Sequence, residues 1–465
     1  MKYVPLGLSE DIGASCHYLQ IDGTGILLDA GVDPNGEGSA GIPKLDLLVN
    51  HPDRPVDHII VTHAHHDHLG GLPVIVRTFP HAAVHMTAAT RELADILLPA
   101  SARLQERKLR EGTSTSDPIF SEDDVEACSY LYASHDLESS FDVTGYRGKS
   151  PVRAQFFDAG HVLGSVGVQL EYKDGGETKR IFYTGDTGMN HQTILPGATY
   201  PEGDQGILLL ESTLGADSET EMTSRRGEEN RLCEAIAETL KQGGAVLIPV
   251  FALGRGQEII ALVDRFKRRG LIPDDIPVYT AGLMRAIANV YDKTRQTTPR
   301  LNEDFQVFGV PQSRLPRSQA ELKNALSDPS IYVVGSGMVF ERTISNRIAQ
   351  VLAEDAKNTI CLVGYTPPDS PGHLIMEASK LGRGTPVIID RAQGKQPLNC
   401  RVDRFRFSGH SHRRDLLKLV DELNPSQIVL CHGETAARDW MRDNIQYFHP
   451  DIQVNSPETG QELVL

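Results

Sequence analysis

Residues 61–71 read VTHAHHDHLGG and place four histidines and one aspartate within six consecutive positions. The apolar residues just before this stretch predict a β-strand over residues 58–62, and Leu72-Pro73 just after it predicts the start of a helix. Loops at the ends of strands are where α/β proteins place their chemical groups. The stretch therefore predicts a functional site between a strand and a helix.

The spacing of the ionisable residues in this loop suits metal binding. On an extended backbone, alternate side chains share one face, so His63 and His65 can point together, and a turn brings Asp67 and His68 to a neighbouring position. Imidazole with carboxylate is typical of zinc or a similar first-row ion, and a loop without thiolates favours a catalytic site over a structural one. One loop can thus serve two ions. The alternative is a histidine-rich surface loop with no ligand role.

Composition limits the class of protein. A chain of 465 residues exceeds one ordinary core, so we expect two domains, and 40% hydrophobic residues are enough to form them. The six cysteines are scattered singly, without CxxC pairs, and no stretch reads as a signal peptide or a membrane span. We therefore expect a cytoplasmic protein with no membrane partner. A net charge of −16 opposes unspecific binding of polyanions, so any nucleic acid would need local basic clusters.

Short β-branched runs alternate with helical stretches along the chain, which predicts an α/β fold. Histidines nearly vanish between Glu211 and Arg401 and then resume, which indicates one domain inserted into another. The strand runs are 26–28, 58–62, 168–172, 180–184, 206–210, 245–250, 331–334, 359–363 and 427–431.

One loop supplies too few ligands for two ions, and two distant residues are candidates to complete the set. His161 stands among small residues in DAGHVLGS (158–165), and Asp186 does so in TGDTG (184–188), where backbone and metal can approach closely. Taken alone, His161 reads as a core histidine and Asp186 as a turn residue. Their order after the histidine-rich loop favours ligand roles.

Asp29, the HxHxDH stretch, His161 and Asp186 resemble the four successive motifs of the metallo-β-lactamase superfamily. Three further stretches, LEST (210–213), FSGH (407–410) and LCHGE (430–434), are similar to the additional motifs of its β-CASP branch of nucleases, and the likeness is best to RNA-processing members such as ribonuclease J and the nuclease subunit of the cleavage and polyadenylation machinery. The resemblance implies an α/β fold, a four-layer αββα sandwich with an inserted α/β domain.

The resemblance also implies a role for each motif residue. One zinc ion would be held by His63, His65 and His161, and a second by Asp67, His68 and His432, with Asp186 bridging them and Asp29 orienting ligands from behind. Two Zn²⁺ per chain are therefore expected, with Mn²⁺ as the alternative ion. Asp67 and Asp186 would be catalytic as well as ligands. Glu211 and His410 would form a general-acid pair.

The resemblance places the domains at 1–213 (first metallo-β-lactamase part), 214–400 (inserted β-CASP domain) and 401–465 (second metallo-β-lactamase part). Substrate contacts are predicted from Arg255, from Ser336 and Gly337 in a GSG loop, and from Arg404 and Arg414, which flank His410 within a run of five arginines over 401–414. A second basic run at 265–269 reads as the solvated exterior of a helix. His412 reads as a surface residue rather than a ligand.

The leading hypothesis is a metal-dependent ribonuclease acting on single-stranded RNA, as an endonuclease, a 5′ exonuclease or both. A small-molecule hydrolase such as a glyoxalase-like thioesterase or a lactamase needs only the first four motifs and has no use for residues 214–400. A DNA repair nuclease of the same branch generally lacks a histidine at the position of His432. A non-enzymatic scaffold of this family would have lost metal-ligand residues.

The sequence is also compatible with a homo-oligomer.

Overall fold

The computed structural model describes residues 1–7, 12–33, 36, 38–316 and 318–465. The chain divides into two compact units: unit 1 comprises Met1–His191, Leu195–Ser218 and His410–Leu465, and unit 2 comprises Gln192–Ile194 and Glu219–Gly409. Unit 2 is thus an insertion within unit 1. Its main segment begins and ends a few residues later than the 214–400 predicted from the sequence.

Unit 1 contains a first sheet of seven strands, in which the half that carries the histidine-rich loop is parallel. Pairing is antiparallel from β22 to β3 and parallel from β3 to β6, so β3, β4 and β5 end at the same edge of the sheet. The strand order is β22 (Leu463–Val464), β1 (Lys2–Pro5), β2 (His17–Ile21), β3 (Thr24–Leu28), β4 (His58–Ile60), β5 (Ala83–Met86) and β6 (Tyr132–Ser134).

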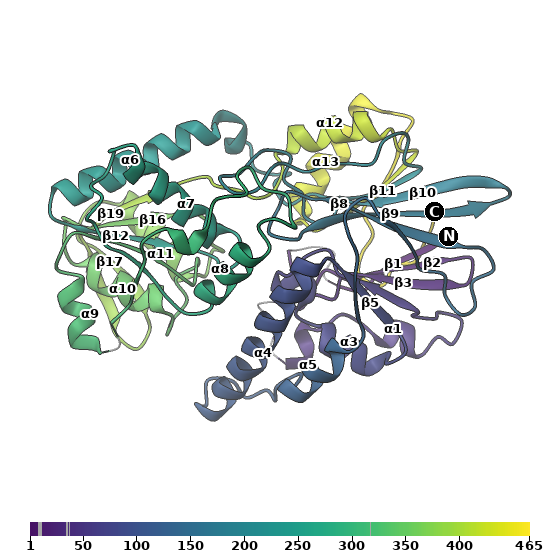
Figure 1. The fold of residues 1–465 in the computed structure, drawn as a ribbon, viewed down its shortest axis with the longest axis horizontal. Coiled ribbons are helices and arrows are strands. Elements are labelled where there is room, and N and C mark those ends of the chain that lie inside the picture. Colours follow the sequence, from purple (N-terminus) through teal and green to yellow (C-terminus); the bar gives the residue numbers. More distant parts are fainter. Residues whose placement is uncertain (8–11, 34–35, 37, 317) are drawn as a thin grey trace. The chain divides into compact units, whose positions relative to one another are not determined.

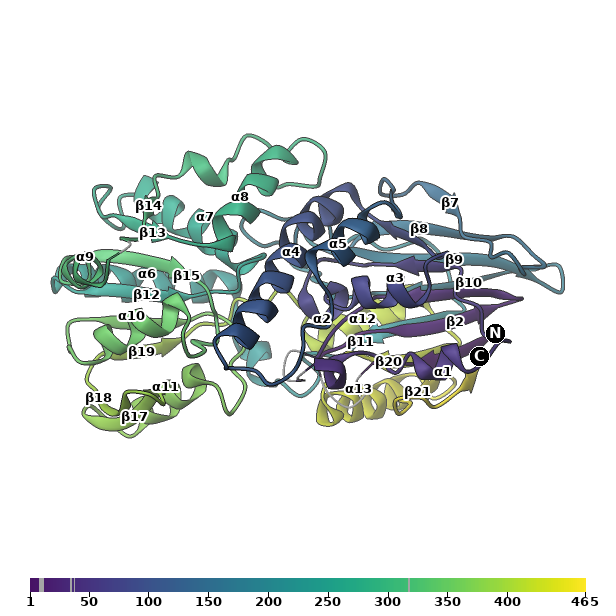
Figure 2. The same cartoon turned by 90° about the horizontal axis from the view of Figure 1, so that it is seen from below.

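The second sheet of unit 1 also has seven strands and is mixed. Strands β7 to β10 form antiparallel neighbours, which run side by side in Figure 2, whereas β10, β11, β20 and β21 are parallel. The order is β21 (Gln453–Asn455), β20 (Gln427–Cys431), β11 (Ile207–Glu211), β10 (Glu177–Tyr183), β9 (Val166–Asp174), β8 (Val152–Asp158) and β7 (Ser140–Asp142).

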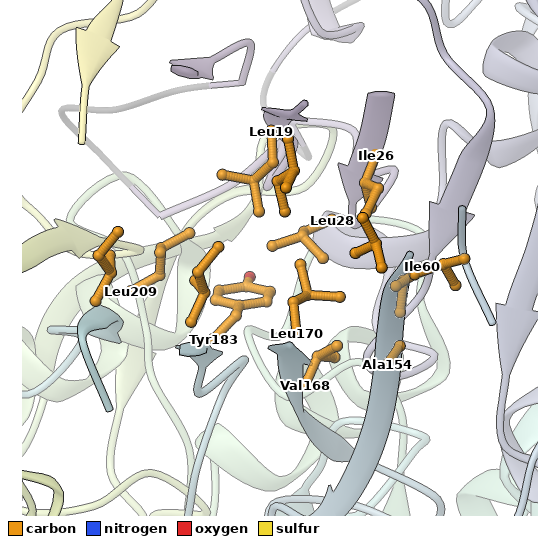
Figure 3. Packing of buried hydrophobic residues seen from close by; sticks show 14 of the residues in the cluster. Leu19, Ile26, Leu28, Ile60, Ala154, Val168, Leu170, Tyr183 and Leu209 are labelled. Atoms are coloured by element: carbon orange, nitrogen blue, oxygen red, sulfur yellow. The ribbon is translucent and has the colours of Figure 1, made fainter. Parts of the chain in front are cut away.

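The two sheets of unit 1 lie face to face between two layers of helices (Figure 1). Leu28 and Ile60 from the first sheet meet Leu170 and Leu209 from the second in a buried cluster between the sheets (Figure 3). This is the predicted αββα sandwich. Its helices are α1 (Asp46–Val49), α2 (His66–Leu69), α3 (Leu72–Thr78), α4 (Ala88–Arg110) and α5 (Glu122–Ser129) with the first sheet, and α12 (Arg413–Leu423) and α13 (Thr435–Phe448) with the second.

Strand β11 shows how the sequence builds two apolar layers at once. Ile207 and Leu209 pack between the sheets, while Leu208 and Leu210 pack toward α12 and α13. Side chains along a strand alternate between its faces, so a strand buried on both sides is a continuous apolar run. Glu211 ends this run and is itself fully buried, which requires polar partners at that point.

Unit 2 is built on a six-stranded sheet that is parallel throughout. Helices α10 and α11 pack on it through a buried cluster, and α6 and α7 also contact its strands. The order is β14 (Ser313–Arg314), β13 (Val278–Thr280), β15 (Ser330–Val334), β12 (Ala245–Pro249), β16 (Thr359–Leu362) and β19 (Arg401–Arg404), with a separate pair β17 (Thr385–Asp390) and β18 (Gly394–Leu398). The helices are α6 (Arg225–Lys241), α7 (Arg255–Arg268), α8 (Leu283–Lys293), α9 (Gln319–Ala325), α10 (Ile344–Ala353) and α11 (Pro371–Lys380).

All nine predicted strand runs are confirmed, and several other strands were missed. Strand β8 carries an alternating pattern, with Val152, Ala154 and Phe156 buried and Arg153 exposed, that continuous apolar runs do not reveal. Strand β5 is short, and a histidine, His85, interrupts it. None of the described helices has the length and apolar character that crossing a membrane requires.

Candidate metal centre and active site

The first ligand group forms at the ends of strands from both sheets of unit 1. The Nε2 atoms of His63 and His161 lie 3.1 and 3.2 Å from Nδ1 of His65, and each lies 3.6 Å from Oδ2 of Asp186. Each of these four residues offers a ligand atom, and the four atoms lie within 4.8 Å of one another. Three nitrogens and one oxygen around one point suit a tetrahedral zinc ion.

The second group adjoins the first and comprises Asp67, His68 and His432. Helix α2 begins right after His65, and its single turn swings Asp67 and His68 away from the side shared by His63 and His65. His432 follows β20 and brings its Nε2 to 3.3 Å from Oδ2 of Asp67. The turn predicted from the sequence is present, and residues 365 positions apart meet through it.

Asp186 lies between the two groups and presents one oxygen to each. Its Oδ2 faces His63 and His161, whereas its Oδ1 lies 3.4 Å from Nε2 of His68 and 3.1 Å from Nδ1 of His432. This is the arrangement that a carboxylate bridging two cations requires. In the part of the chain that the structure describes, Asp186 Oδ1 and His68 Nε2 are buried yet make no hydrogen bond.

Two unsatisfied buried polar atoms that face each other are costly unless a further partner completes them. A cation held by both residues would satisfy these atoms, so the donor set fits a metal centre. Burial, with the neighbouring His68, holds the pKa of His63 well below its usual value and keeps that imidazole neutral. Burial would raise the pKa of Asp186, but His432 and His68 hold it well below the usual range. Neutral imidazole and ionised carboxylate are the states that bind metals.

Asp29 supports the second group from behind. Its carboxylate is fully buried and accepts hydrogen bonds from the backbone N–H and hydroxyl of Thr62 at 2.7 and 2.9 Å, from Nδ1 of His68 at 2.8 Å and from the hydroxyl of Tyr183 at 2.8 Å. Holding Nδ1 of His68 leaves Nε2 to face Asp186. Asp29 has φ 64°, a left-handed conformation that an aspartate tolerates better than most residues.

Glu211 and His410 form a hydrogen-bonded pair beside the first group. Nδ1 of His410 lies 3.0 Å from Oε2 of Glu211, and the imidazole ring centre lies 4.5 Å from that of His161. The Glu211 side chain is 1% exposed, whereas that of His410 is 20% exposed and is therefore the member that solvent can reach. Burial lowers the pKa of His410, but Glu211 and then Asp186 and Asp67 raise it to about 9. Bound cations would offset the two aspartates and leave Glu211 as the lasting influence.

The predicted substrate contacts lie on several separate elements. Arg255 begins α7, and its Nη1 is buried without a hydrogen bond among the described residues. Burial and the nearby Arg225 lower its pKa to about 10. Ser336 and Gly337 lie in the loop after β15, Arg404 is exposed at the end of β19, and Arg414 is exposed in the first turn of α12. These contacts stay predictions.

Ion pairs reduce the charge of the two basic runs. Arg401 pairs with Glu238 and Asp403, and Arg406 pairs with Glu219, so only part of the 401–414 cluster can act as a free cationic surface. In the 265–269 run, Arg265 pairs with Glu229, Lys267 donates to two backbone carbonyls and Arg268 pairs with Asp264. The interpretation of this run as a solvated helix exterior is therefore only partly right: Arg268 and Arg269 are exposed, but Lys267 is buried because its ammonium group bonds to backbone carbonyls.

The hydroxyl groups around the ligands were not predicted from the sequence. Thr62, Tyr183 and Thr213 each hydrogen-bond to an acidic residue of the site. Threonine and tyrosine are common in strands and turns, so nothing in their type or spacing distinguishes them. Thr213 stood within the LEST stretch, but its partners are known only from the fold.

Comparison with known proteins agrees with this geometry. Residues 10–211 match the metallo-beta-lactamase superfamily, residues 256–375 the Beta-Casp domain, and residues 395–457 the Zn-dependent metallo-hydrolase RNA specificity domain. The chain is 29% identical to an RNase J-like protein of Methanocaldococcus jannaschii, over 92% of this chain and 91% of that protein. It is 28% identical to the endoribonuclease YSH1 of Candida glabrata, over 93% of this chain and 55% of the relative.

The chain spans about half the length of several of the curated relatives that it matches. A crystal structure of a protein of unknown function from Enterococcus faecalis V583 superposes with a TM-score of 0.55 at 14% identity, covers 100% of this chain and 99% of its own, and shows the same fold. The sandwich and its paired ligand groups define a metallo-hydrolase fold. With the three domain matches, the chain belongs to the β-CASP branch of the metallo-β-lactamase superfamily.

Proposed function

We propose that this chain is a metal-dependent ribonuclease that hydrolyses phosphodiester bonds of single-stranded RNA in RNA processing or decay. The observation that carries the proposal is the junction at Asp186, where two ligand groups meet beside the Glu211–His410 pair. Seven ligand-type side chains with an adjacent imidazole–carboxylate pair supply what hydrolysis of a phosphodiester needs: a way to hold cations and a proton donor for the leaving oxygen.

We assign the first ion to His63, His65 and His161 and the second to Asp67, His68 and His432, with Asp186 shared. Two zinc ions are proposed, with Mn²⁺ as the alternative. When bound, such cations lower the pKa of water so that hydroxide is available near neutral pH, and they stabilise negative charge on phosphoryl oxygens.

The chain's own residues perform the remaining work. Asp29 holds His68 through Nδ1 and thereby aims Nε2 at Asp186. Glu211 is held in place by the backbone N–H of Thr187, which donates to its Oε1 at 2.6 Å, and it orients His410. The His410 imidazolium, which Glu211 stabilises, would donate a proton to the leaving 3′-oxygen as the P–O bond breaks.

RNA as the substrate is supported by two observations. The match to an RNA specificity domain covers residues 395–457 and so includes both His410 and His432. Curated relatives across more than 90% of this chain carry the names endoribonuclease and RNase J-like protein. Phosphate contacts are proposed for Arg255, Ser336, Gly337, Arg404 and Arg414.

The test is direct cleavage by the purified protein. Single-stranded RNA and DNA of one sequence, labelled at the 5′ end or internally, are incubated with the protein before and after treatment with a chelator, and again after Zn²⁺ or Mn²⁺ is returned. We expect RNA to be cut, the chelator to abolish cleavage, metal to restore it, and Asp186→Asn to stay inactive with metal.

Product lengths distinguish internal cutting from stepwise removal of 5′ nucleotides. A lactam and a thioester are assayed in parallel, because a small-molecule hydrolase of the same superfamily would turn these over. Turnover of either small substrate without cleavage of RNA would reject the proposal, and equal cleavage of DNA and RNA would reject the specificity for RNA.

A further inference from the structure

The hydroxyl of Thr213 lies between the predicted general-acid pair and the second ligand group. Its Oγ1 is 2.5 Å from Oε2 of Glu211, 3.0 Å from Nδ1 of His432 and 3.2 Å from the backbone carbonyl oxygen of His432. Thr213 follows β11 and His432 follows β20, two parallel strands paired with Glu211 opposite Cys431. The register of the sheet therefore fixes this contact.

The direction of the hydrogen bonds follows from the groups that meet. A hydroxyl has one proton to donate, and the Glu211 carboxylate, which can only accept, is both nearer and charged, so it takes that proton in preference to the carbonyl oxygen. The hydroxyl oxygen is then left to accept, and its neighbour is Nδ1 of His432. That nitrogen must carry the ring proton.

A neutral imidazole with its proton on Nδ1 has its lone pair on Nε2. In His432, Nε2 is the atom that lies 3.3 Å from Oδ2 of Asp67, within the second ligand group. Asp186 Oδ1 is also close to Nδ1, at 3.1 Å, but it makes no hydrogen bond among the described residues. Thr213 is thus the hydroxyl that sets which nitrogen of His432 faces the group.

His68 is held in the same way. Asp29 binds its Nδ1 at 2.8 Å and leaves Nε2 to face Asp186. The second group therefore has two imidazoles, and each is tied at Nδ1 by a residue that is not itself in the group. Partners of this kind fix the tautomer and the ring orientation of metal-binding histidines.

Thr213 also acts on the other side of the site. Glu211 holds His410 through the same Oε2 that accepts the Thr213 hydroxyl. His432, Thr213, Glu211 and His410 thus form one hydrogen-bonded chain that joins a ligand of the second group to the proton donor.

We propose that Thr213 is a positioning residue that fixes the tautomer of His432 for the second metal ion and holds Glu211 in place for His410. The inference rests on the metal centre of the proposed function. It deepens that function by naming a residue that connects the second metal ion to the general acid His410.

The first test measures metal binding without any substrate. Chelator-treated protein is titrated with Zn²⁺ in competition with a chromophoric chelator for the wild type, Thr213→Val, Thr213→Ser and Ser212→Ala. Valine keeps the shape of threonine without the hydroxyl, and serine keeps the hydroxyl. Ser212→Ala is the matched control, because its buried hydroxyl donates to the Cys431 carbonyl and not to Glu211 or to the His432 ring.

We expect Thr213→Val to weaken one of the two Zn²⁺ binding steps by roughly 10- to 100-fold, the usual effect of removing such a partner, and to leave the other step unchanged. Thr213→Ser and Ser212→Ala should keep both steps. If folded Thr213→Val binds Zn²⁺ in two steps with wild-type affinities, the inference is overturned. It is also overturned if Thr213→Ser weakens Zn²⁺ binding as much as Thr213→Val does. If the valine variant does not fold, Thr213→Ala is measured under the same criteria.

The second test measures turnover at saturating metal. Thr213→Val should lower kcat with KM for RNA unchanged, since Thr213 is placed to act on the proton donor and not on substrate binding, and serine should rescue it. An unchanged kcat would refute the link to His410. If the wild type cuts no RNA but Thr213→Val still weakens one Zn²⁺ step, the ribonuclease proposal fails while the positioning of His432 stands.

Discussion

Nδ1 of His410 lies 3.0 Å from Oε2 of Glu211, although 199 positions separate the two residues in the chain. Glu211 ends a strand that is buried on both faces, and His410 is the first residue of unit 1 after the inserted unit 2. The contact places a partly exposed imidazole beside the two groups that carry the other histidines, in a separate cluster with Asp186 and Glu211.

Replacing His410 with alanine should separate proton donation from metal binding. We expect kcat to fall by about 10²- to 10⁴-fold, the usual contribution of a positioned general acid, with two metal equivalents retained in elemental analysis. His412→Ala, two residues away, is the control and should keep the wild-type rate. Loss of metal from His410→Ala would show instead that His410 is a ligand.

Replacing Asp67 and Asp186 should remove different numbers of ions. Asp67→Asn leaves His63, His65, His161 and Asp186 in place. Four donors are enough to hold one zinc ion, so we expect about one metal equivalent to remain. Asp186→Asn should reduce both sites, because each of its oxygens faces one group. The two variants are compared by elemental analysis of folded protein. Equal loss of metal from both would contradict the assignment of Asp186 as the shared ligand.

A row of three histidines away from the metal centre should make stability depend on pH. His58 Nδ1 lies 3.0 Å from His85 Nε2, and His85 Nδ1 lies 2.9 Å from His135 Nε2. Burial, with His58 and His135 as neighbours, lowers the pKa of His85 to about 3. The unfolded chain binds a proton near pH 6.5 and the folded chain does not, so stability is full above pH 6.5 and is lost as pH falls toward 3.

The free energy of unfolding should therefore fall between pH 6.5 and 5 by about 2 kcal/mol from His85. His85→Gln keeps a polar side chain without this titration and should show a shallower slope. Urea denaturation at each pH measures the free energy of unfolding of the wild type and of His85→Gln. Both proteins are treated with a chelator beforehand, so that loss of metal does not contribute. Parallel slopes for the two proteins would exclude His85 as the source.

Reversing the charge of Arg404 should weaken RNA binding and spare the chemistry. Its exposed guanidinium has no acidic partner among the residues that the structure describes, so it is available to a phosphate. We expect Arg404→Glu to raise KM for RNA and to reduce the slope of log K against log salt by roughly 0.7, the value for one phosphate contact on a single strand. Hydrolysis of bis-p-nitrophenyl phosphate should stay nearly unchanged.

The control for this experiment is Arg383→Glu. Arg383 is exposed in the loop between α11 and β17 and undergoes the same change of net charge. A similar loss in both variants would mean that overall charge, and not a contact of Arg404, sets the affinity. Equal loss on RNA and on the small phosphodiester would place Arg404 in the support of the fold.

The class of this protein could be predicted from the sequence, because the motifs that mark it are local patterns. The predicted strand runs are mainly apolar and span three to six residues, and the HxHxDH loop holds its ligands within one turn, so neither depends on distant parts of the chain. Through their resemblance to the motifs of the metallo-β-lactamase superfamily, Asp29, the loop, His161 and Asp186 also implied the sandwich and the two ligand groups. Strands such as β8, with one exposed face, were missed because only alternation marks them.

The contacts among the site residues could not be predicted from the sequence and follow from the fold. The two oxygens of Asp186 face different groups because β10 places its following loop between the ends of strands from both sheets. The run at 265–269 proved to be paired with acids and carbonyls of its own unit, which no count of charges can show. Thr213 has no distinctive chemistry in the sequence. It acquires a role because parallel pairing of β11 with β20 sets its hydroxyl between Glu211 and His432, and such contacts depend on distance in space, not on distance along the chain.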